Sequence, residues 1–159
     1  MKILVLNGPN LNLLGKREPD VYGNASLDDI LARLTKRATE LGADIASFQS
    51  NDEGALVTRI GESIGKYDGI IMNPAAYTHT SVALRDALLA CKVPCVEVHL
   101  SNIHAREDFR HKSMTAAACI GQISGFAGTS YILALEGLVE YLTHKEGAVA
   151  AGRMRDDKE

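Results

Sequence analysis

The stretch Lys2-Ile3-Leu4-Val5-Leu6-Asn7-Gly8-Pro9-Asn10 decides the fold class, because a short apolar run ends there in a sharp turn sequence. The run has the length of a strand and lacks the periodicity of an exposed helix. Asn-Gly-Pro-Asn cannot continue a regular strand, so the run ends at a loop. We therefore expect a buried first strand with polar residues at its carboxyl end.

Four further runs of this kind follow, each separated from the next by a helical pattern. The predicted strands are Asp44–Gln49, Gly69–Met72, Val93–Leu100 and Cys119–Ser124. Alternating strands and helices predict an α/β fold, a doubly wound, five-stranded parallel sheet with helices on both faces in three layers, α/β/α.

The helices are bounded by capping residues and apolar stripes. Ser26 with Asp29 predicts a capped start, Leu27 to Leu41 follows helical spacing, and Gly42 is a natural stop. The other three helices are predicted after Asn51 and Asp52 with a stripe of Leu56, Ile60 and Ile64, over Thr80–Cys91, and over Thr129–Leu142. We expect one domain, residues 1–146, and a charged, disordered tail, residues 147–159.

In such a sheet, ligands bind beyond the carboxyl ends of the strands. The residues expected there are Asn7–Asn10, Gln49–Asn51, Asn73–Thr80, His99–Ser101 and Ser124–Thr129. Several of these segments are unusually polar, which predicts a site at this edge.

The composition limits the kinds of molecule that the protein is expected to bind. The chain has 159 residues, 46% of them apolar, and a net charge of −3, which argues against nucleic acid or an anionic membrane as the main partner. No run is long enough to span a membrane, and the N-terminus lacks the features of a signal peptide. Cys91, Cys95 and Cys119 lie in apolar surroundings without zinc-site spacing, so we expect free thiols and a cytoplasmic location.

The long irregular segment from Asn7 to Ala25 carries a tyrosine and an arginine, Tyr22 and Arg17. A tyrosine hydroxyl is a poor base at neutral pH, and a cation beside it favours the phenolate. Loops of this length inside a compact domain are usually functional. The alternative is that Arg17 pairs with Glu18 or Asp20 at the surface.

Glu97 and His99 lie two residues apart on a predicted strand, so both side chains point to the same face. The carboxylate can orient the imidazole and stabilise its charged form, as in a general acid or base. The alternative is a structural histidine that a buried acid satisfies.

Two turns have the composition of anion-binding or hydroxyl-binding sites. The stretch 73–81 leads into a helix N-terminus and includes Asn73 and His79, although its hydroxyls also suit helix capping. Leu100 and Ser101 precede Arg106 and Arg110, which otherwise form a solvated face that Glu107 and Asp108 partly neutralise.

The sequence lacks the residues that define several other classes of protein. No phosphate-binding loop, dinucleotide fingerprint or nucleophile elbow is present in the sequence. A receiver domain would need carboxylates at the first and third strand ends, where Asn7 and Asn73 stand. The histidines do not have metal-ligand spacing, so no metal is expected. No lysine lies at a strand end suited to an imine mechanism.

Taken together, the motifs resemble the type II 3-dehydroquinate dehydratases. The matching stretches are Asn7–Asn12, Arg17–Pro19 with Tyr22-Gly23, Asn73–Ala87, Glu97–Glu107 and Phe109-Arg110, and the likeness spans about residues 2–142. The family's flavodoxin-like fold agrees with the predicted architecture.

The resemblance implies a cofactor-free trans-dehydration of 3-dehydroquinate to 3-dehydroshikimate through an enolate, in the shikimate pathway of aromatic biosynthesis or in quinate breakdown. It implies that Tyr22 is the base, that Arg17 keeps it ionised, that His99 is the acid and that Asn10 holds a water against the enolate. The matching substrate-binding positions are Asn73, His79, Asp86, Leu100, Ser101 and Arg110, with Asp86 reaching a neighbouring subunit. It also implies a homo-oligomer, a dodecamer built from trimers. The competing hypothesis is a non-enzymatic flavodoxin-like module that binds a small carboxylate.

Overall fold

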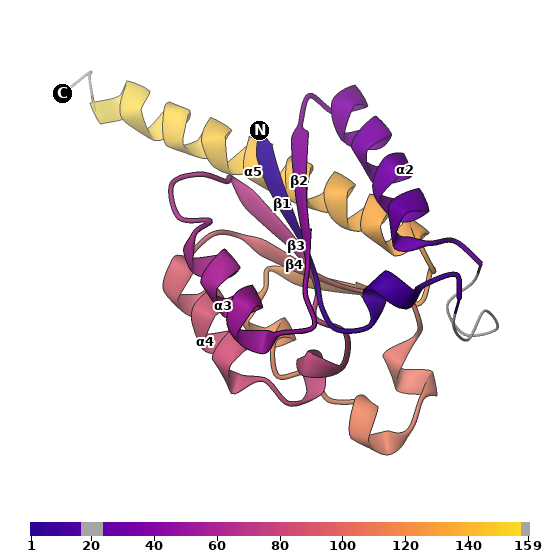
Figure 1. Cartoon of the computed structure of the whole chain (residues 1–159). Coiled ribbons are helices and arrows are strands. Elements are labelled where there is room, and N and C mark those ends of the chain that lie inside the picture. Colours follow the sequence, from indigo (N-terminus) through magenta and orange to yellow (C-terminus); the bar gives the residue numbers. More distant parts are fainter. Residues whose placement is uncertain (17–23, 157–159) are drawn as a thin grey trace.

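The computed structural model describes residues 1–16 and 24–156, with the side chains of the last helix given as far as residue 145. Five parallel strands form one sheet in the order β2-β1-β3-β4-β5 (Figure 1). The strands are β1 (Lys2–Asn7), β2 (Asp44–Gln49), β3 (Gly69–Asn73), β4 (Cys95–His99) and β5 (Gly121–Ser124). The predicted parallel sheet is confirmed, and the strand order reverses at the pair β1 and β3.

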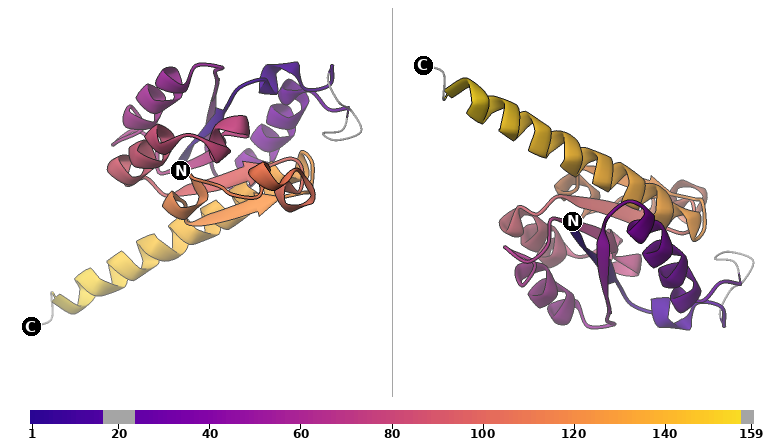
Figure 2. Two further views of the ribbon diagram at one scale, coloured as in Figure 1. Left: turned by 90° about the horizontal axis from the view of Figure 1, so that it is seen from below. Right: turned by 90° about the horizontal axis from the view of Figure 1, so that it is seen from above.

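Helices cover both faces of the sheet (Figures 1 and 2). On one face lie α2 (Leu27–Glu40) and α5 (Thr129–Asp156), and on the other α3 (Glu53–Gly61) and α4 (Val82–Cys91). The alternation of β1 explains both layers, because neighbouring residues of a strand point to opposite faces. Ile3 and Val5 pack in the cluster with α2 and α5, whereas Leu4 and Leu6 pack in the cluster with α3 and α4.

The helix starts depend on short polar side chains, as predicted. The Ser26 hydroxyl accepts a hydrogen bond from the Asp29 amide at 3.1 Å, and Asp29 in return accepts one from the Ser26 amide at 2.9 Å. Gly42, with φ of 71°, follows α2 in the left-handed conformation that favours glycine. Asp52 caps α3 through the Ala55 amide, at 2.8 Å.

One expectation about the helices was wrong. Ile64 was assigned to the buried stripe of α3, but α3 ends at Gly61 and Ile64 is 59% exposed. The last helix, α5, extends to Asp156, and residues 157–159 lie outside the described residues, so disorder of the tail stays a prediction.

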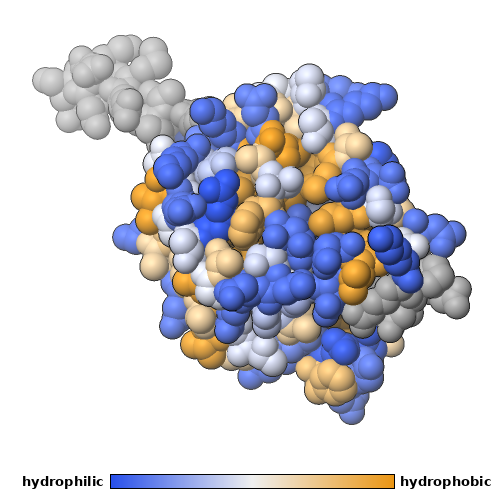
Figure 3. Space-filling model, in the orientation of Figure 1, coloured by the Kyte–Doolittle hydropathy of each residue, from blue (hydrophilic) through white to orange (hydrophobic). Residues whose placement is uncertain are grey.

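The surface has no large apolar area on the face drawn in Figure 3, where hydrophilic and apolar residues are interspersed. Within the described part of the chain, no helix combines the length and apolar character that crossing a bilayer requires.

Candidate active site

A cavity of about 300 Å³ opens at the carboxyl ends of β1, β3 and β4, where the switch-point rule places ligand sites. Polar side chains from several loops line it together with Leu11, Leu14 and Ile103. Seven of the residues predicted for the site line this cavity: Asn10, Asn73, His79, His99, Leu100, Ser101 and Arg110. The volume suits a small ring-sized ligand.

Two main-chain loops are in close contact beside the cavity, which Pro9 of the first loop and Asn73 at the start of the second line. The Gly8 amide donates a hydrogen bond to the Asn73 carbonyl at 2.8 Å. A Cβ at position 8 would lie 2.4 Å from the Pro74 carbonyl oxygen, so only glycine fits. The loop after β1 and the loop after β3 are therefore held together by backbone atoms.

Asn10 lies in the left-handed region, with φ of 66°, and its amide donates a hydrogen bond to Asn51 Oδ1 at 3.0 Å. Gln49 Nε2 donates to the same oxygen at 3.2 Å, and the Tyr77 hydroxyl donates to the Asn51 carbonyl at 2.5 Å. Asn51 was predicted as a helix cap. It instead fixes the turn that presents Asn10 to the cavity.

Asn73 belongs to a buried network that the sequence did not reveal. Its Nδ2 donates to the Tyr131 hydroxyl at 3.0 Å, and that hydroxyl donates to Asn7 Oδ1 at 2.7 Å. Asn73 Oδ1 accepts a hydrogen bond from the Ala75 amide at 3.1 Å. Because both ends of the amide are engaged, Asn73 has one defined orientation at the cavity wall. Burial also raises the pKa of the Tyr131 phenol, so its hydroxyl is neutral.

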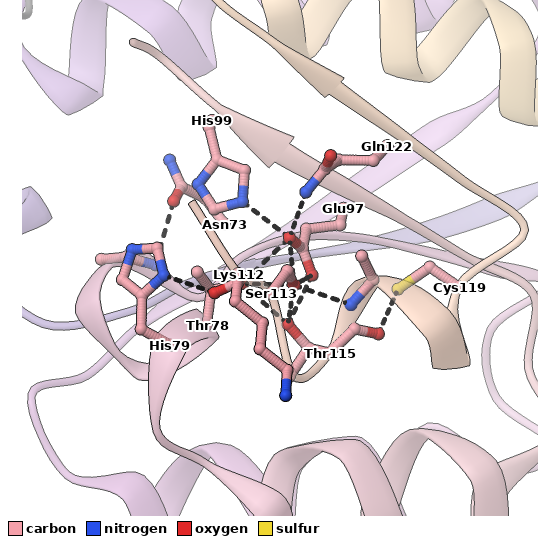
Figure 4. A network of polar contacts seen from close by, with 12 residues as sticks. Asn73, Thr78, His79, Glu97, His99, Lys112, Ser113, Thr115, Cys119 and Gln122 are labelled. Carbon is pink, nitrogen blue, oxygen red and sulfur yellow. Dashed lines mark hydrogen bonds and ion pairs between the residues drawn. The ribbon is translucent and has the colours of Figure 1, made fainter. Parts of the chain in front are cut away.

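Glu97 lies at the centre of the polar network drawn in Figure 4. Its carboxylate is completely buried and lies 2.7 Å from His99 Nε2. Further hydrogen bonds to Glu97 come from the side chains of Thr78, Ser113, Thr115 and Gln122. The contact expected between Glu97 and His99 is therefore present, and the carboxylate has many additional donors.

Opposing effects set the ionisation of Glu97. Burial raises the pKa of this carboxyl, but hydrogen bonds from His99 and Thr115, the His99 charge and the Gln122 amide together lower it from 4.5 to about 2. Glu97 is therefore ionised at neutral pH and has no proton to give. His99 Nε2 must donate in their hydrogen bond, which leaves Nδ1 as the second ring nitrogen of a histidine that lines the cavity.

The cavity also carries two arginines and one acid. Arg110 Nε lies 3.0 Å from Glu107 Oε2, and Arg106 Nε lies 3.7 Å from the same oxygen. All three residues line the cavity. The predicted partial neutralisation by Glu107 is thus observed, and the described residues that line the cavity include two arginines and one carboxylate. Such a wall favours an anionic ligand.

Four predicted residues are not placed in the cavity. Glu97 contacts His99, which lines the cavity, but does not line it itself. Arg17 and Tyr22 lie outside the described residues. Asp86 is exposed on α4 and does not line the cavity. Gly15 and Asn24 lie close together, because a Cβ at Gly15 would lie 3.2 Å from the Asn24 carbonyl oxygen.

Fold and cavity together define a doubly wound α/β protein with a histidine–carboxylate pair beside an anion-binding wall at its switch point. The family model for class II dehydroquinases matches residues 1–139, and the chain belongs to this family.

Named relatives agree with this assignment. A 3-dehydroquinate dehydratase of Geotalea daltonii is 58% identical over 142 residues, which is 89% of this chain and 99% of the relative. Its counterpart from Synechocystis sp. is 60% identical over 141 residues, 89% of this chain and 93% of the relative. Among solved structures, a type II dehydroquinase of Butyrivibrio crossotus superposes with a TM-score of 0.85 at 44% identity, over 87% of this chain and 97% of that one.

Proposed function

We propose that this protein is a 3-dehydroquinate dehydratase that removes water from 3-dehydroquinate to give 3-dehydroshikimate, without metal, organic cofactor or imine. Membership of the class II dehydroquinase family supports this substrate. The observation that carries the proposal is the position of His99, which lines an arginine-bearing cavity and contacts the ionised Glu97 at 2.7 Å.

In this proposal, the reaction begins with proton removal next to the ketone. Tyr22, kept as a phenolate by Arg17, takes this proton. The resulting enolate needs a fixed donor, and Asn10 supplies it through a water molecule. The left-handed turn fixed by Asn51 supports this role of Asn10, since it places the residue at the cavity wall.

The second step expels hydroxide, which is a poor leaving group unless an acid protonates it. His99 gives this proton from Nδ1, and Glu97 stabilises the imidazolium before the transfer. Acid and base act on opposite faces of the ring, which gives trans elimination. The network around Glu97 supports this assignment because an ionised carboxylate cannot take over the role of the acid.

The substrate's carboxylate and hydroxyls occupy the remaining polar positions. The backbone amides of Leu100 and Ser101 bind the carboxylate, and Arg110 contributes its positive charge. Asn73 and His79 bind the substrate's hydroxyl groups. The cavity wall that contains all five residues supports this arrangement.

The proposal extends to assembly and location. Asp86 reaches the site of a neighbouring subunit in a dodecamer built from trimers; its exposed position on α4, away from the cavity, supports this role. An active, monomeric wild-type protein in sedimentation would count against it. The cysteines are free thiols, which supports a cytoplasmic enzyme.

A direct assay tests the function. Purified protein is mixed with 3-dehydroquinate, and the ultraviolet band of the conjugated enone product is followed. We expect the band with wild-type protein, a loss of several orders of magnitude in Tyr22→Phe, and severe impairment in His99→Ala. Saturable binding without any band would favour a non-enzymatic carboxylate-binding module, and inactivation by borohydride with substrate would indicate an imine mechanism.

A further inference from the structure

The segment Lys112–Thr115 does not line the cavity, yet it contacts both cavity histidines or their partners. It contacts His79 directly, and it contacts Glu97, the hydrogen-bond partner of His99. Figure 4 shows Lys112, Ser113 and Thr115 beside His79 and Glu97. The two histidines come from different elements, because His79 ends the short helix η2 (Ala75–His79) and His99 ends β4. One irregular segment therefore bridges two parts of the site.

The first contact is with His79. Its Nδ1 lies 2.8 Å from the carbonyl oxygen of Lys112. A carbonyl can only accept a hydrogen bond, so Nδ1 must carry a proton. The Lys112 carbonyl thus sets the tautomer of His79 and leaves Nε2 as its other ring nitrogen.

The second contact is with Glu97. Ser113 Oγ lies 2.9 Å from Oε1 and 3.1 Å from Oε2, and the Thr115 hydroxyl donates to Oε2. Five side chains donate to the carboxylate: Thr78, His99, Ser113, Thr115 and Gln122. Two carboxylate oxygens offer about four acceptor positions. A proton on Glu97 would therefore have to displace a donor.

The donors divide unequally between the two oxygens. Oε1 accepts from His99 and from the Gln122 amide, at 2.7 and 2.8 Å, and from the hydroxyls of Thr78 and Ser113, both at 2.9 Å. Oε2 accepts only from Ser113 and Thr115 among the described residues. Removing the Thr115 hydroxyl therefore leaves Oε2 with a single donor, whereas removing a donor from Oε1 leaves several.

The segment itself is firmly held. The Met114 amide donates to the Thr78 carbonyl at 2.6 Å, and Arg85 Nη1 donates to the Met114 carbonyl at 3.2 Å. The Ala116 amide donates to Ser113 Oγ at 2.9 Å, which turns the Ser113 hydroxyl proton towards Glu97. Thr115 is fully buried, so water cannot replace its hydroxyl.

We propose that Thr115 and Ser113 are positioning residues of the dehydration reaction, which hold Glu97 as a carboxylate so that the transferable proton stays on His99. The inference rests on the proposed function for its kinetic consequence, although its structural part does not. Neither residue touches the cavity. Both act through Glu97, while the same segment fixes His79 through Lys112.

The decisive comparison is between Thr115→Val and Thr115→Ser. Valine keeps the shape of threonine but removes the hydroxyl, and serine keeps the hydroxyl but removes the methyl group. We expect Thr115→Val to lower kcat roughly ten- to a hundredfold with little change in KM, the size of effect of a lost hydrogen bond to a charged group. Thr115→Ser should stay close to wild type. The reverse order would overturn the proposal, because it would make packing the role of Thr115.

Ser113→Ala provides a second test if Thr115→Val does not fold, since Ser113 is only partly buried. We expect a smaller fall in kcat, again with little change in KM. A rise in KM with unchanged kcat would contradict action through His99.

Nitrogen NMR of the imidazole of His99 separates this inference from the proposed function. The wild type should show Nε2 protonated and hydrogen-bonded near neutral pH, and Thr115→Val should shift that resonance while Thr115→Ser should not. Identical spectra for all three proteins would overturn the inference. A wild type without activity on 3-dehydroquinate would overturn the proposed function, and the spectra would still decide the role of Thr115.

Discussion

The Tyr131 hydroxyl on α5 accepts a hydrogen bond from Asn73 Nδ2 at the end of β3, at 3.0 Å, with both side chains buried. The same hydroxyl donates to Asn7 Oδ1 at 2.7 Å, so one phenol connects the ends of β1 and β3 from behind the cavity. Asn7 Nδ2 has no hydrogen-bond partner among the described residues. The network therefore already contains one buried donor without a partner, and it is sensitive to the loss of a further hydrogen bond.

Tyr131→Phe should raise KM for the substrate several-fold and lower the free energy of unfolding by about 1–3 kcal/mol, because two buried polar groups lose their partner. Steady-state kinetics and urea denaturation measure the two effects. Tyr141→Phe is the matched control on the same helix, since Tyr141 is 43% exposed. Equal behaviour of the two variants would show that the phenol does not position Asn73.

Glu97 predicts a particular dependence of stability on pH. Its pKa is about 2 in the folded protein and near 4.5 ordinarily, so above pH 4.5 its contribution to stability is fully present. As the pH falls from 4.5 towards 2, the unfolded chain binds a proton that the folded protein does not, and this contribution is lost. Glu97→Gln should be less stable at pH 7 and should lose less stability over this range.

Denaturant unfolding at pH 7, 5, 4 and 3 tests this behaviour. Glu140→Gln is the control, because Glu140 is exposed and its only ion pair is with the exposed His144, at 3.6 Å, among the described residues. Parallel curves for wild type and Glu97→Gln would contradict the low pKa of Glu97.

Asn51 should control activity through the backbone of Asn10. Asn51→Leu removes the oxygen that the Asn10 and Gln49 donors share, whereas Asn51→Asp keeps an acceptor there. We expect kcat to fall several-fold in Asn51→Leu and to stay near wild type in Asn51→Asp. If both variants kept full activity, the turn at Asn10 would not depend on this side chain.

Gly8→Ala should destabilise the protein severely, because the added Cβ would lie 2.4 Å from a backbone oxygen of Pro74 that cannot rotate away. Thermal unfolding followed by circular dichroism measures the loss. Gly61→Ala is the matched control, since a Cβ at this position in α3 meets nothing within 4 Å and alanine favours helix. Equal melting temperatures for the two variants would disprove the close approach.

Local patterns in the sequence were sufficient for most of the fold. The capping pair of Ser26 and Asp29 lies within one helical turn, and the apolar run of β1 is visible without any tertiary contact. Ligands of such sheets bind where the strand order reverses, and this rule correctly predicted that residues from three strand ends line one cavity. The Ile64 error arose because its spacing continues the apolar stripe after α3 has ended at Gly61.

The supporting residues of the site could not be found in this way. Tyr131 meets Asn73 across 58 residues of sequence, and Thr115 meets Glu97 across 18. Tyr131 looks like any aromatic residue in an amphipathic helix. Thr115 stands in an irregular segment without periodicity, so only the tertiary structure shows that its hydroxyl donates to a buried carboxylate.

The main-chain contact at Gly8 has a consequence for selectivity. Where side chains form a wall, a ligand of the wrong outline can be admitted by a change of rotamer. Here two loop backbones touch through a residue without a side chain, with a hydrogen bond of 2.8 Å from Gly8 to Asn73. Gly8 and Pro74 do not line the cavity, but their contact fixes the spacing between Pro9 and Asn73, which do. No rotamer change can widen this spacing, so ligand analogues enlarged between these two residues should be rejected by shape alone.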